Sequence, residues 1–238
     1  MIFWIASYPK SGNTWLRALL SAYYYSNDGF FNQFLLNNIG QFPEKKYFSV
    51  FDYNSRVVTD TAKFWIKAQE KINQDKSIKF FKTHNFLGKI NNNNFTNKEN
   101  SLGGVYIIRD PRNVITSLKN HFEFSTDQAL NFMVSENKFI FDRFKENDYS
   151  DFQFISSWEK NYQSWTKQKQ FSIKLVKYED LYKNTYETFK EIITFIEKTI
   201  GTNKQFDKKR AQNSVNSTTF EKMKNLETIK MDNDINNE

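Results

Sequence analysis

The chain has 238 residues, 39% of them hydrophobic, which suits one α/β domain with a sizeable buried core. It has no cysteine, which excludes disulfides and thiolate metal sites, and its two histidines argue against an all-histidine metal centre. The net charge of +7 favours an anionic partner, either a small molecule or nucleic acid. However, Lys, Asn, Phe and Ile are all abundant, and an AT-rich genome encodes these residues most readily. A bias of the genome therefore explains the positive charge equally well.

Two absences concern location. No run of about 18 apolar residues is present, so we expect no membrane span. No basic region precedes the apolar stretch at the N-terminus, which argues against a secretory leader. The sequence therefore predicts a cytoplasmic protein and leaves its oligomeric state open.

Apolar runs and helical periodicity alternate along the chain. Strands are predicted at 2–7, 78–83, 104–109 and 172–178. Helices are predicted at 13–25, 60–73, 111–121, 127–143, 151–169, 185–200 and 205–213. This alternation predicts an α/β fold, a single domain over 1–238 with a central, doubly wound parallel sheet flanked by helices. In such sheets ligands collect at the carboxyl ends of the strands.

Two regions lack a clear pattern. Residues 26–59 are weakly patterned, and a segment of that length in a compact domain is either a binding loop or disordered. The polar, aperiodic stretch at 91–100 predicts an exposed loop.

The first motif is residues 8–15, Tyr-Pro-Lys-Ser-Gly-Asn-Thr-Trp, between the first predicted strand and helix. A strand, a glycine-bearing turn and a helix aim backbone N–H groups and the positive end of the helix dipole at one point, so the segment predicts a P-loop-like phosphate cradle. It differs from the nucleoside-triphosphate loop because Lys10 precedes Gly12. Taken alone, it also suits an ordinary βα turn with Asn13 or Thr14 as N-cap.

The second segment is the predicted strand at 78–83 and the residue that follows it. Side chains alternate along a strand, so Lys82 and His84 point to the same side. His84 suits general-base chemistry because its ordinary pKa lies near 6.5, and Lys82 suits stabilisation of charge on a transferring group. A structural histidine bonded to a loop carbonyl, beside a solvated lysine, is the alternative.

The third segment, at 104–117, is a strand that ends at Arg109 and turns into a helix. Asp110 and Pro111 are explained as the N-cap and first residue of that helix. The guanidinium of Arg109 leaves the strand beside the phosphate cradle, where it suits a phosphate monoester. Ser117 follows eight residues later on the same helix.

In this order the three segments resemble those of the sulfotransferases that use 3′-phosphoadenosine 5′-phosphosulfate as donor, and the chain is similar to a cytosolic-type, bacterial-like member. The resemblance runs from residue 1 to about 224. It implies that His84 is the catalytic base, assisted by Lys10 and Lys82. It also implies that the two phosphates of the donor are held by the following residues: Lys10, Ser11, Gly12, Asn13 and Thr14 at the 5′-phosphate, and Arg109 and Ser117 at the 3′-phosphate.

The resemblance further implies an adenine site. Trp15 and Tyr178 correspond to aromatic residues near the adenine, and both suit purine stacking. Thr218 and Phe220, in a shorter and weaker match, correspond to residues that close over the base. Aromatic residues make up 18% of the chain, so core packing explains Trp15 and Tyr178 equally well.

One element of the family has no counterpart. The family carries Arg-Lys-Gly followed by Gly-x-Trp-Lys near its C-terminus, where it grips the 3′-phosphate, and no such sequence is present here. We therefore expect either a truncated chain or a member that binds the donor with less of this clamp. The loss weakens donor binding by about 1.5–3 kcal/mol for each charge-assisted hydrogen bond.

The sequence thus predicts a sulfotransferase that moves a sulfuryl group to a hydroxyl, or less favourably an amine, of a small-molecule or saccharide acceptor, without a metal and without nucleic acid. A small-molecule kinase with an atypical phosphate loop is one alternative, but it needs magnesium and an acidic ligand, for which Asp110 is the only strand-end candidate. A non-catalytic protein that binds nucleotide or nucleic acid is another. The expected walls of the acceptor site are 26–59 and 123–150.

Overall fold

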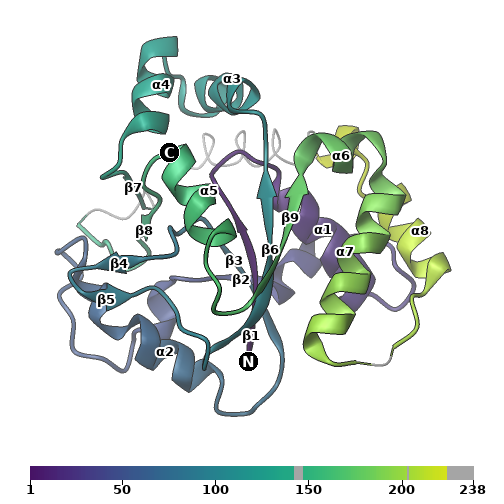
Figure 1. Cartoon of the computed structure of the whole chain (residues 1–238), viewed down its shortest axis with the longest axis horizontal. Coiled ribbons are helices and arrows are strands. Elements are labelled where there is room, and N and C mark those ends of the chain that lie inside the picture. Colours follow the sequence, from purple (N-terminus) through teal and green to yellow (C-terminus); the bar gives the residue numbers. More distant parts are fainter. Residues whose placement is uncertain (142–146, 203, 224–238) are drawn as a thin grey trace.

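Five strands form the sheet at the centre of the molecule, in the order β2-β3-β1-β6-β9 (Figure 1). The computed structural model describes residues 1–141, 147–202 and 204–223. The strand bounds are β1 Ile2–Ser7, β2 Gly40–Gln41, β3 Lys79–Thr83, β6 Ser101–Ile108 and β9 Ser172–Lys177. All neighbouring strands of this sheet run parallel. The predicted α/β fold with a central parallel sheet is confirmed.

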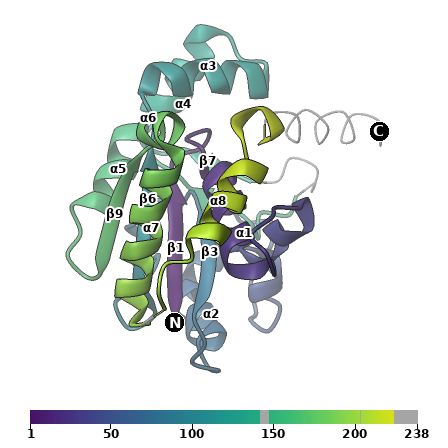
Figure 2. The ribbon, with the colours of Figure 1, turned by 90° about the vertical axis from the view of Figure 1, so that its right-hand side faces the viewer.

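Helices cover both faces of the sheet. In Figure 2, α1, α7 and α8 lie in front of one face, while α2 and α5 pack on the other. The helices α3 and α4 lie beyond the carboxyl ends of the strands (Figure 1). The α-helix bounds are α1 Asn13–Tyr25, α2 Trp65–Ile72, α3 Pro111–Phe122, α4 Thr126–Val134, α5 Trp158–Thr166, α6 Tyr178–Lys183, α7 Thr185–Ile200 and α8 Lys208–Ser217. No helix in these described ranges is long and apolar enough to cross a bilayer.

Short elements fill the connections. The 3₁₀ turns are η1 Gln33–Asn38, η2 Lys45–Tyr47 and η3 Asp60–Phe64. Two antiparallel pairs lie outside the main sheet: β4 Lys89–Ile90 with β5 Asn93–Asn94, and β7 Phe139–Ile140 with β8 Gln153–Phe154. The weakly patterned region 26–59 thus supplies the edge strand β2 as well as two 3₁₀ turns.

The middle strand β1 shows how the sequence makes a sheet with two buried faces. Phe3 and Ile5 belong to the core shared with α1 and α7, whereas Ile2, Trp4 and Ala6 belong to the core shared with α2 and α5. All five are fully buried. Strand side chains alternate between faces, so an unbroken apolar run is what a parallel strand covered on both sides requires.

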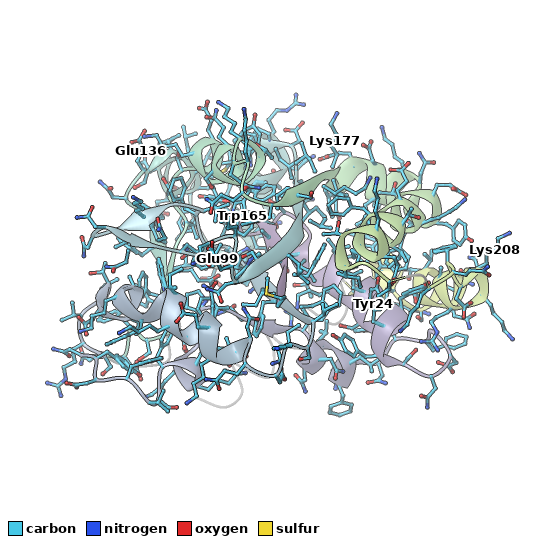
Figure 3. The ribbon with its side chains drawn as sticks, turned by 60° about the horizontal axis from the view of Figure 1, so that its bottom comes forward. Tyr24, Glu99, Glu136, Trp165, Lys177 and Lys208 are labelled. Atoms are coloured by element: carbon cyan, nitrogen blue, oxygen red, sulfur yellow. The ribbon has the colours of Figure 1, made fainter. Side chains whose placement is uncertain are left out.

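A tryptophan on α5 links the core beneath α2 and α5 to the chain that follows β3. Trp165 lies in the interior between the sheet and its helix, whereas Lys177 and Lys208 lie toward the outside (Figure 3). The indole Nε1 of Trp165 donates to the carbonyl oxygen of Asn85 at 2.9 Å. This bond fixes the chain just after β3.

Two predicted helices are shorter than expected. The helix predicted at 151–169 begins only at Trp158, because Ser156 has a left-handed φ of 56° and the side chain of Ser157 caps the helix by accepting from the N–H of Lys160. The helix predicted at 127–143 ends at Val134, where the backbone of Ser135 is extended, and its last two predicted residues lie outside the described ranges.

Two other expectations also need correction. The segment at 91–100 is not wholly an exposed loop, because Asn91 and Asn92 form the turn of the β4–β5 hairpin while Thr96 and Asn100 are buried. The strand predicted to include Tyr178 ends at Lys177, and Tyr178 opens a helix that the apolar pattern did not predict.

Candidate functional site

The predicted site residues gather at the carboxyl edge of the sheet. Ser7, Thr83, Ile108 and Lys177 end the four long strands, and the segments that directly follow them carry the predicted residues of 10–15, His84, Arg109 and Tyr178. Of the others, Lys82 lies within β3, Ser117 lies on α3, and Thr218 and Phe220 follow α8. Ligand sites of doubly wound sheets lie at this edge. The topology therefore brings the separate motifs together.

The first loop has the backbone of an anion cradle. Lys10 and Gly12 both have left-handed φ angles, 62° and 97°. Gly12 is the N-cap of α1 without a capping side chain, so the first N–H groups of the helix remain available at its positive end. A Cβ on Gly12 would lie 2.4 Å from Cδ2 of Tyr178, so close contact also requires glycine here. This geometry suits a phosphate.

The side chain of Asn13 braces this loop. Its Nδ2 donates to the carbonyl oxygen of Ile5 at 3.0 Å and to Oγ of Ser7 at 3.2 Å. Since its Oδ1 can only accept, the part of Asn13 that suits a phosphate is its backbone N–H. The hydroxyl of Ser11 is fully buried and has no hydrogen-bond partner among the described residues. Thr14 lies beside them in the first turn of α1, half-buried.

His84 is held through its ring by β1. Its Nδ1 lies 2.8 Å from the carbonyl oxygen of Ser7 and 3.1 Å from the Ser7 hydroxyl. A carbonyl oxygen only accepts, so this contact assigns the proton to Nδ1 and leaves Nε2 as the free acceptor. Burial and the charge of Lys82, followed by those of Arg17 and Lys10, hold the pKa of His84 well below its usual value of 6.5. The ring is therefore neutral at physiological pH.

Two amide side chains that the sequence analysis did not single out hold the backbone of His84. Its N–H donates to Oε1 of Gln153 at 2.7 Å, and its carbonyl accepts from Nδ2 of Asn161 at 2.9 Å. The hydroxyl of Tyr106 donates to Oδ1 of Asn161 at 2.7 Å. The anchors lie 69 and 77 residues away along the chain, so no local pattern reports them.

The ammonium group of Lys82 donates to Oε1 of Gln41 at 2.8 Å. Gln41 lies opposite Lys82 in the register of β2 and β3. The positive charges of Lys82, Arg17 and Lys10 all lower the pKa of His84. Gln41 is a residue of this site that sequence reasoning missed.

Arg109 joins the third segment to the first loop. Its Nη1 donates to the carbonyl oxygen of Lys10 at 3.1 Å, and its Cζ lies 4.4 Å from the ring centroid of Tyr178. Its Nε is buried without a hydrogen-bond partner among the described residues. A buried guanidinium N–H without an acceptor favours an anionic ligand at this point.

The turn after Arg109 is braced from α6. The backbone N–H of Asp110 donates to Oε1 of Glu179 at 3.0 Å. The predicted capping is confirmed: the carboxylate of Asp110 accepts from the N–H of Arg112, and Pro111 is the first residue of α3. The same carboxylate bonds the guanidinium of Arg112, which lowers the pKa of Asp110 to about 2. Ser117 lies half-buried on α3, about 9 Å along the helix axis from Pro111.

The predicted adenine residues are linked by ring contacts and a hydrogen bond. The ring centroids of Trp15 and Tyr178 lie 5.8 Å apart, and Nε1 of Trp15 donates to the carbonyl oxygen of Thr218 at 2.6 Å. The hydroxyl of Thr218 donates to the carbonyl oxygen of Ser214 on α8. Phe220 is exposed, and its ring contacts Tyr182 of α6, whose ring in turn contacts Trp15 and Tyr178. Trp15 therefore contacts two of the other predicted adenine residues directly, and Phe220 joins them through Tyr182.

The region of the C-terminal phosphate clamp lies outside this description. The segment 224–238 lies outside the described residues. The sequence there contains no Arg-Lys-Gly element, and the weaker donor binding expected from its lack stays a prediction.

Comparison with known proteins identifies the family. The sulfotransferase domain family model matches residues 2–238. The chain is similar to the crystal structure of mouse sulfotransferase SULT7A1 complexed with PAP, with a TM-score of 0.55 and 17% identity, over 94% of this chain and 66% of that chain. No curated protein matches the sequence. This chain, with its phosphate loop, strand-end histidine and strand-end arginine, belongs to the sulfotransferase domain family.

Proposed function

We propose that the protein transfers a sulfuryl group from 3′-phosphoadenosine 5′-phosphosulfate to a hydroxyl group of a small-molecule or saccharide acceptor. The observation that carries this proposal is the position of His84. Its Nδ1 donates a hydrogen bond to the carbonyl oxygen of Ser7, which directly precedes the loop at 8–15. Because Nδ1 carries the proton of the neutral ring, Nε2 can accept a proton. A base beside an anion cradle is the combination that sulfuryl transfer to a hydroxyl needs.

In this reaction His84 takes the proton of the acceptor hydroxyl at Nε2. The acceptor oxygen forms a bond to sulfur while the bond from sulfur to the bridging oxygen of the 5′-phosphate breaks, and the adenosine bisphosphate leaves. Lys10 and Lys82 stabilise the negative charge that grows on the bridging and sulfuryl oxygens. The proposal includes no metal.

The donor phosphates are assigned to two separate features. The backbone N–H groups of 11–15 and the charge of Lys10 suit the 5′-phosphate. Arg109, with its buried Nε, and Ser117 suit the 3′-phosphate. An added Arg-Lys-Gly element should strengthen binding of this second phosphate, whereas equal affinity would show that the element is dispensable.

Isothermal titration calorimetry with 3′-phosphoadenosine 5′-phosphate tests the donor, with AMP and magnesium-ATP as controls. We expect binding of the bisphosphate in the micromolar range and none of comparable strength with the controls. A preference for magnesium-ATP would favour a kinase, although the carboxylate of Asp110 is already engaged by capping and by Arg112. Binding of nucleic acid with a steep salt dependence, and none of nucleotides, would favour the non-catalytic alternative.

Three further expectations belong to this proposal. We expect the acceptor to approach His84 between walls contributed by 26–59, which includes Gln41, and by 123–150, of which 142–146 lie outside the described residues. A cytoplasmic location stays a prediction, for which cell fractionation is the measurement. The single-domain organisation over 1–238 also stays a prediction, and limited proteolysis measures it.

A further inference from the structure

The two-residue strand β2 places a neutral amide beside the lysine of the site. Gln41 and Lys82 are partners in the parallel register of β2 and β3, and the N–H of Phe42 donates to the carbonyl oxygen of Lys82 at 3.0 Å. Partners in register lie on the same face of a sheet, so the two side chains extend to the same side. The amide oxygen of Gln41 accepts from the ammonium group of Lys82 at 2.8 Å. The sheet thus delivers an acceptor to this lysine.

The core fixes the face on which Gln41 lies. Phe42 is fully buried in the core shared with α2 and α5, and Ile39 is fully buried in the core shared with α1 and α7. Because strand side chains alternate between faces, Gln41 lies opposite Phe42, on the face that α1 covers. A slip of this strand by one residue would move both apolar side chains out of their cores. Packing therefore holds the amide next to Lys82.

Arg17 of α1 holds the chain where β2 begins. Its Nη2 donates to the carbonyl oxygen of Leu36 at 3.1 Å and to that of Ile39 at 2.7 Å. Burial lowers the pKa of Arg17 to about 10, so the guanidinium is still charged at physiological pH. Both carbonyls lie directly before Gly40, the first residue of β2. Charge-assisted hydrogen bonds from the helix that follows the phosphate loop therefore set the start of this strand.

The acceptor for Lys82 is an amide and not a carboxylate, and the two differ in charge. An amide oxygen orients an ammonium group without adding a negative charge to the site. A carboxylate in the same place would offset the charge of the lysine and repel an anionic ligand. The charge of Lys82 is felt in the site, because it lowers the pKa of His84. A neutral acceptor therefore suits a lysine that serves an anionic group.

We propose that Gln41 is a positioning residue, which orients the ammonium group of Lys82 for the sulfuryl group of the donor while adding no negative charge. The inference rests on the proposed sulfuryl-donor function, in which Lys82 stabilises charge on the sulfuryl oxygens. Gln41 acts through Lys82, so its effect belongs to the ligand that carries the sulfuryl group. The bisphosphate that remains after transfer lacks this group and does not report the effect.

The test compares two ligands by calorimetry. The ligand 3′-phosphoadenosine 5′-phosphosulfate carries the sulfuryl group, and adenosine 3′,5′-bisphosphate lacks it. The variants are Gln41→Met, Gln41→Glu, Lys82→Met and the double variant of Gln41→Met with Lys82→Met. Gln74→Glu is the matched control, because Gln74 is exposed and lies before β3, on the side of its amino end. Circular dichroism melting checks that each variant is folded.

We expect Gln41→Met to weaken binding of the sulfated donor by about fivefold, because Lys82 loses the acceptor that orients it. Gln41→Glu should weaken it by about tenfold or more, because the carboxylate repels the sulfuryl group. Both variants should bind the bisphosphate within about twofold of wild type. In the Lys82→Met background, Gln41→Met should cause no further loss. Gln74→Glu should behave as wild type.

Three results would overturn the positioning role while leaving the donor assignment standing. They are equal losses for both ligands, no loss for either ligand in Gln41→Met and Gln41→Glu, and an undiminished loss from Gln41→Met when Lys82 is already replaced. The last result would show that Gln41 acts independently of the lysine. Failure of the wild-type protein to bind either ligand would overturn the donor assignment itself, and the positioning role with it.

Discussion

The site has a histidine corner, around His84, and an arginine corner, around Arg109. The two corners differ in how completely the protein supplies hydrogen-bond partners for these residues. At the end of β3, His84 has partners for its backbone N–H, its backbone carbonyl and its ring Nδ1. At the end of β6, Arg109 has one carbonyl acceptor and one aromatic ring, while its Nε is buried without an acceptor among the described residues. Both corners lie on the same edge of the sheet.

Under the proposed function, this difference separates reaction from binding. His84, the proposed base, is held in the tautomer that the proposed proton transfer requires, so little reorganisation remains for that step. The arginine still has a donor to satisfy, so a ligand anion completes its surroundings. Substitutions at the first corner should therefore change turnover, and substitutions at the second should change donor affinity.

The largest expected effect is that of His84→Ala. Removal of the base should lower kcat by about a hundredfold or more, because positioned proton transfer contributes about 10²–10⁴-fold. Binding of the adenosine bisphosphate should stay within about twofold, since His84 contacts no predicted phosphate ligand except through charge. His121→Ala, which replaces the other histidine of the chain, is the control. Turnover at the wild-type rate in His84→Ala would refute the base assignment.

Arg109→Ala should have the next largest effect, and on binding. Loss of charge-assisted hydrogen bonds of about 1.5–3 kcal/mol corresponds to bisphosphate binding weaker by about tenfold to a hundredfold. AMP lacks the 3′-phosphate, so its weak binding should not change. Arg112→Ala is the matched control, because Arg112 is highly exposed and paired with Asp110. If Arg109→Ala binds the bisphosphate with unchanged affinity, the assignment of the 3′-phosphate to Arg109 is wrong.

The two corners also differ in how far sequence alone could predict them. The loop at 8–15 and the turn at Asp110 and Pro111 are local features, because the residues that shape them are neighbours in the chain, and both have the predicted conformation. The anchors of His84, Gln153 and Asn161, are far away in sequence and come together only through packing of the sheet. Local patterns carry no information on such contacts.

Missed boundaries have similar causes. Val176 and Tyr178 are apolar residues two positions apart at the end of β9, so Tyr178 was assigned to the strand although it opens α6. Glu179 and Asp180 supply negative charge in the first turn of a helix, which is the local signal that favours a helix here. Tyr182 was missed as a consequence, because its place beside Tyr178 depends on helical spacing.

The pH dependence tests the neutral state of His84. The base must be unprotonated to act, so kcat/KM falls when the pH drops below the pKa of His84 in the free enzyme. A histidine with the ordinary pKa of about 6.5 would lose about fourfold between pH 7.5 and 6.0, whereas the lowered pKa of His84 should reduce this loss to less than about twofold. An acid limb with a midpoint at 6.5 or above would show that burial and Lys82 do not hold the ring neutral.

The smallest effect expected of a substitution comes from the brace of the arginine corner. Glu179 accepts from the backbone N–H of Asp110, immediately after Arg109, so Glu179→Ala leaves that N–H without this acceptor and loosens the turn. The loss should appear as bisphosphate binding weaker by about threefold, within the range expected for one hydrogen bond, while kcat at saturating donor stays unchanged. Glu179→Gln keeps an acceptor oxygen and should bind as wild type. A fall in kcat with unchanged affinity would mean that this corner takes part in the reaction, and the division between a reacting corner and a binding corner would fail.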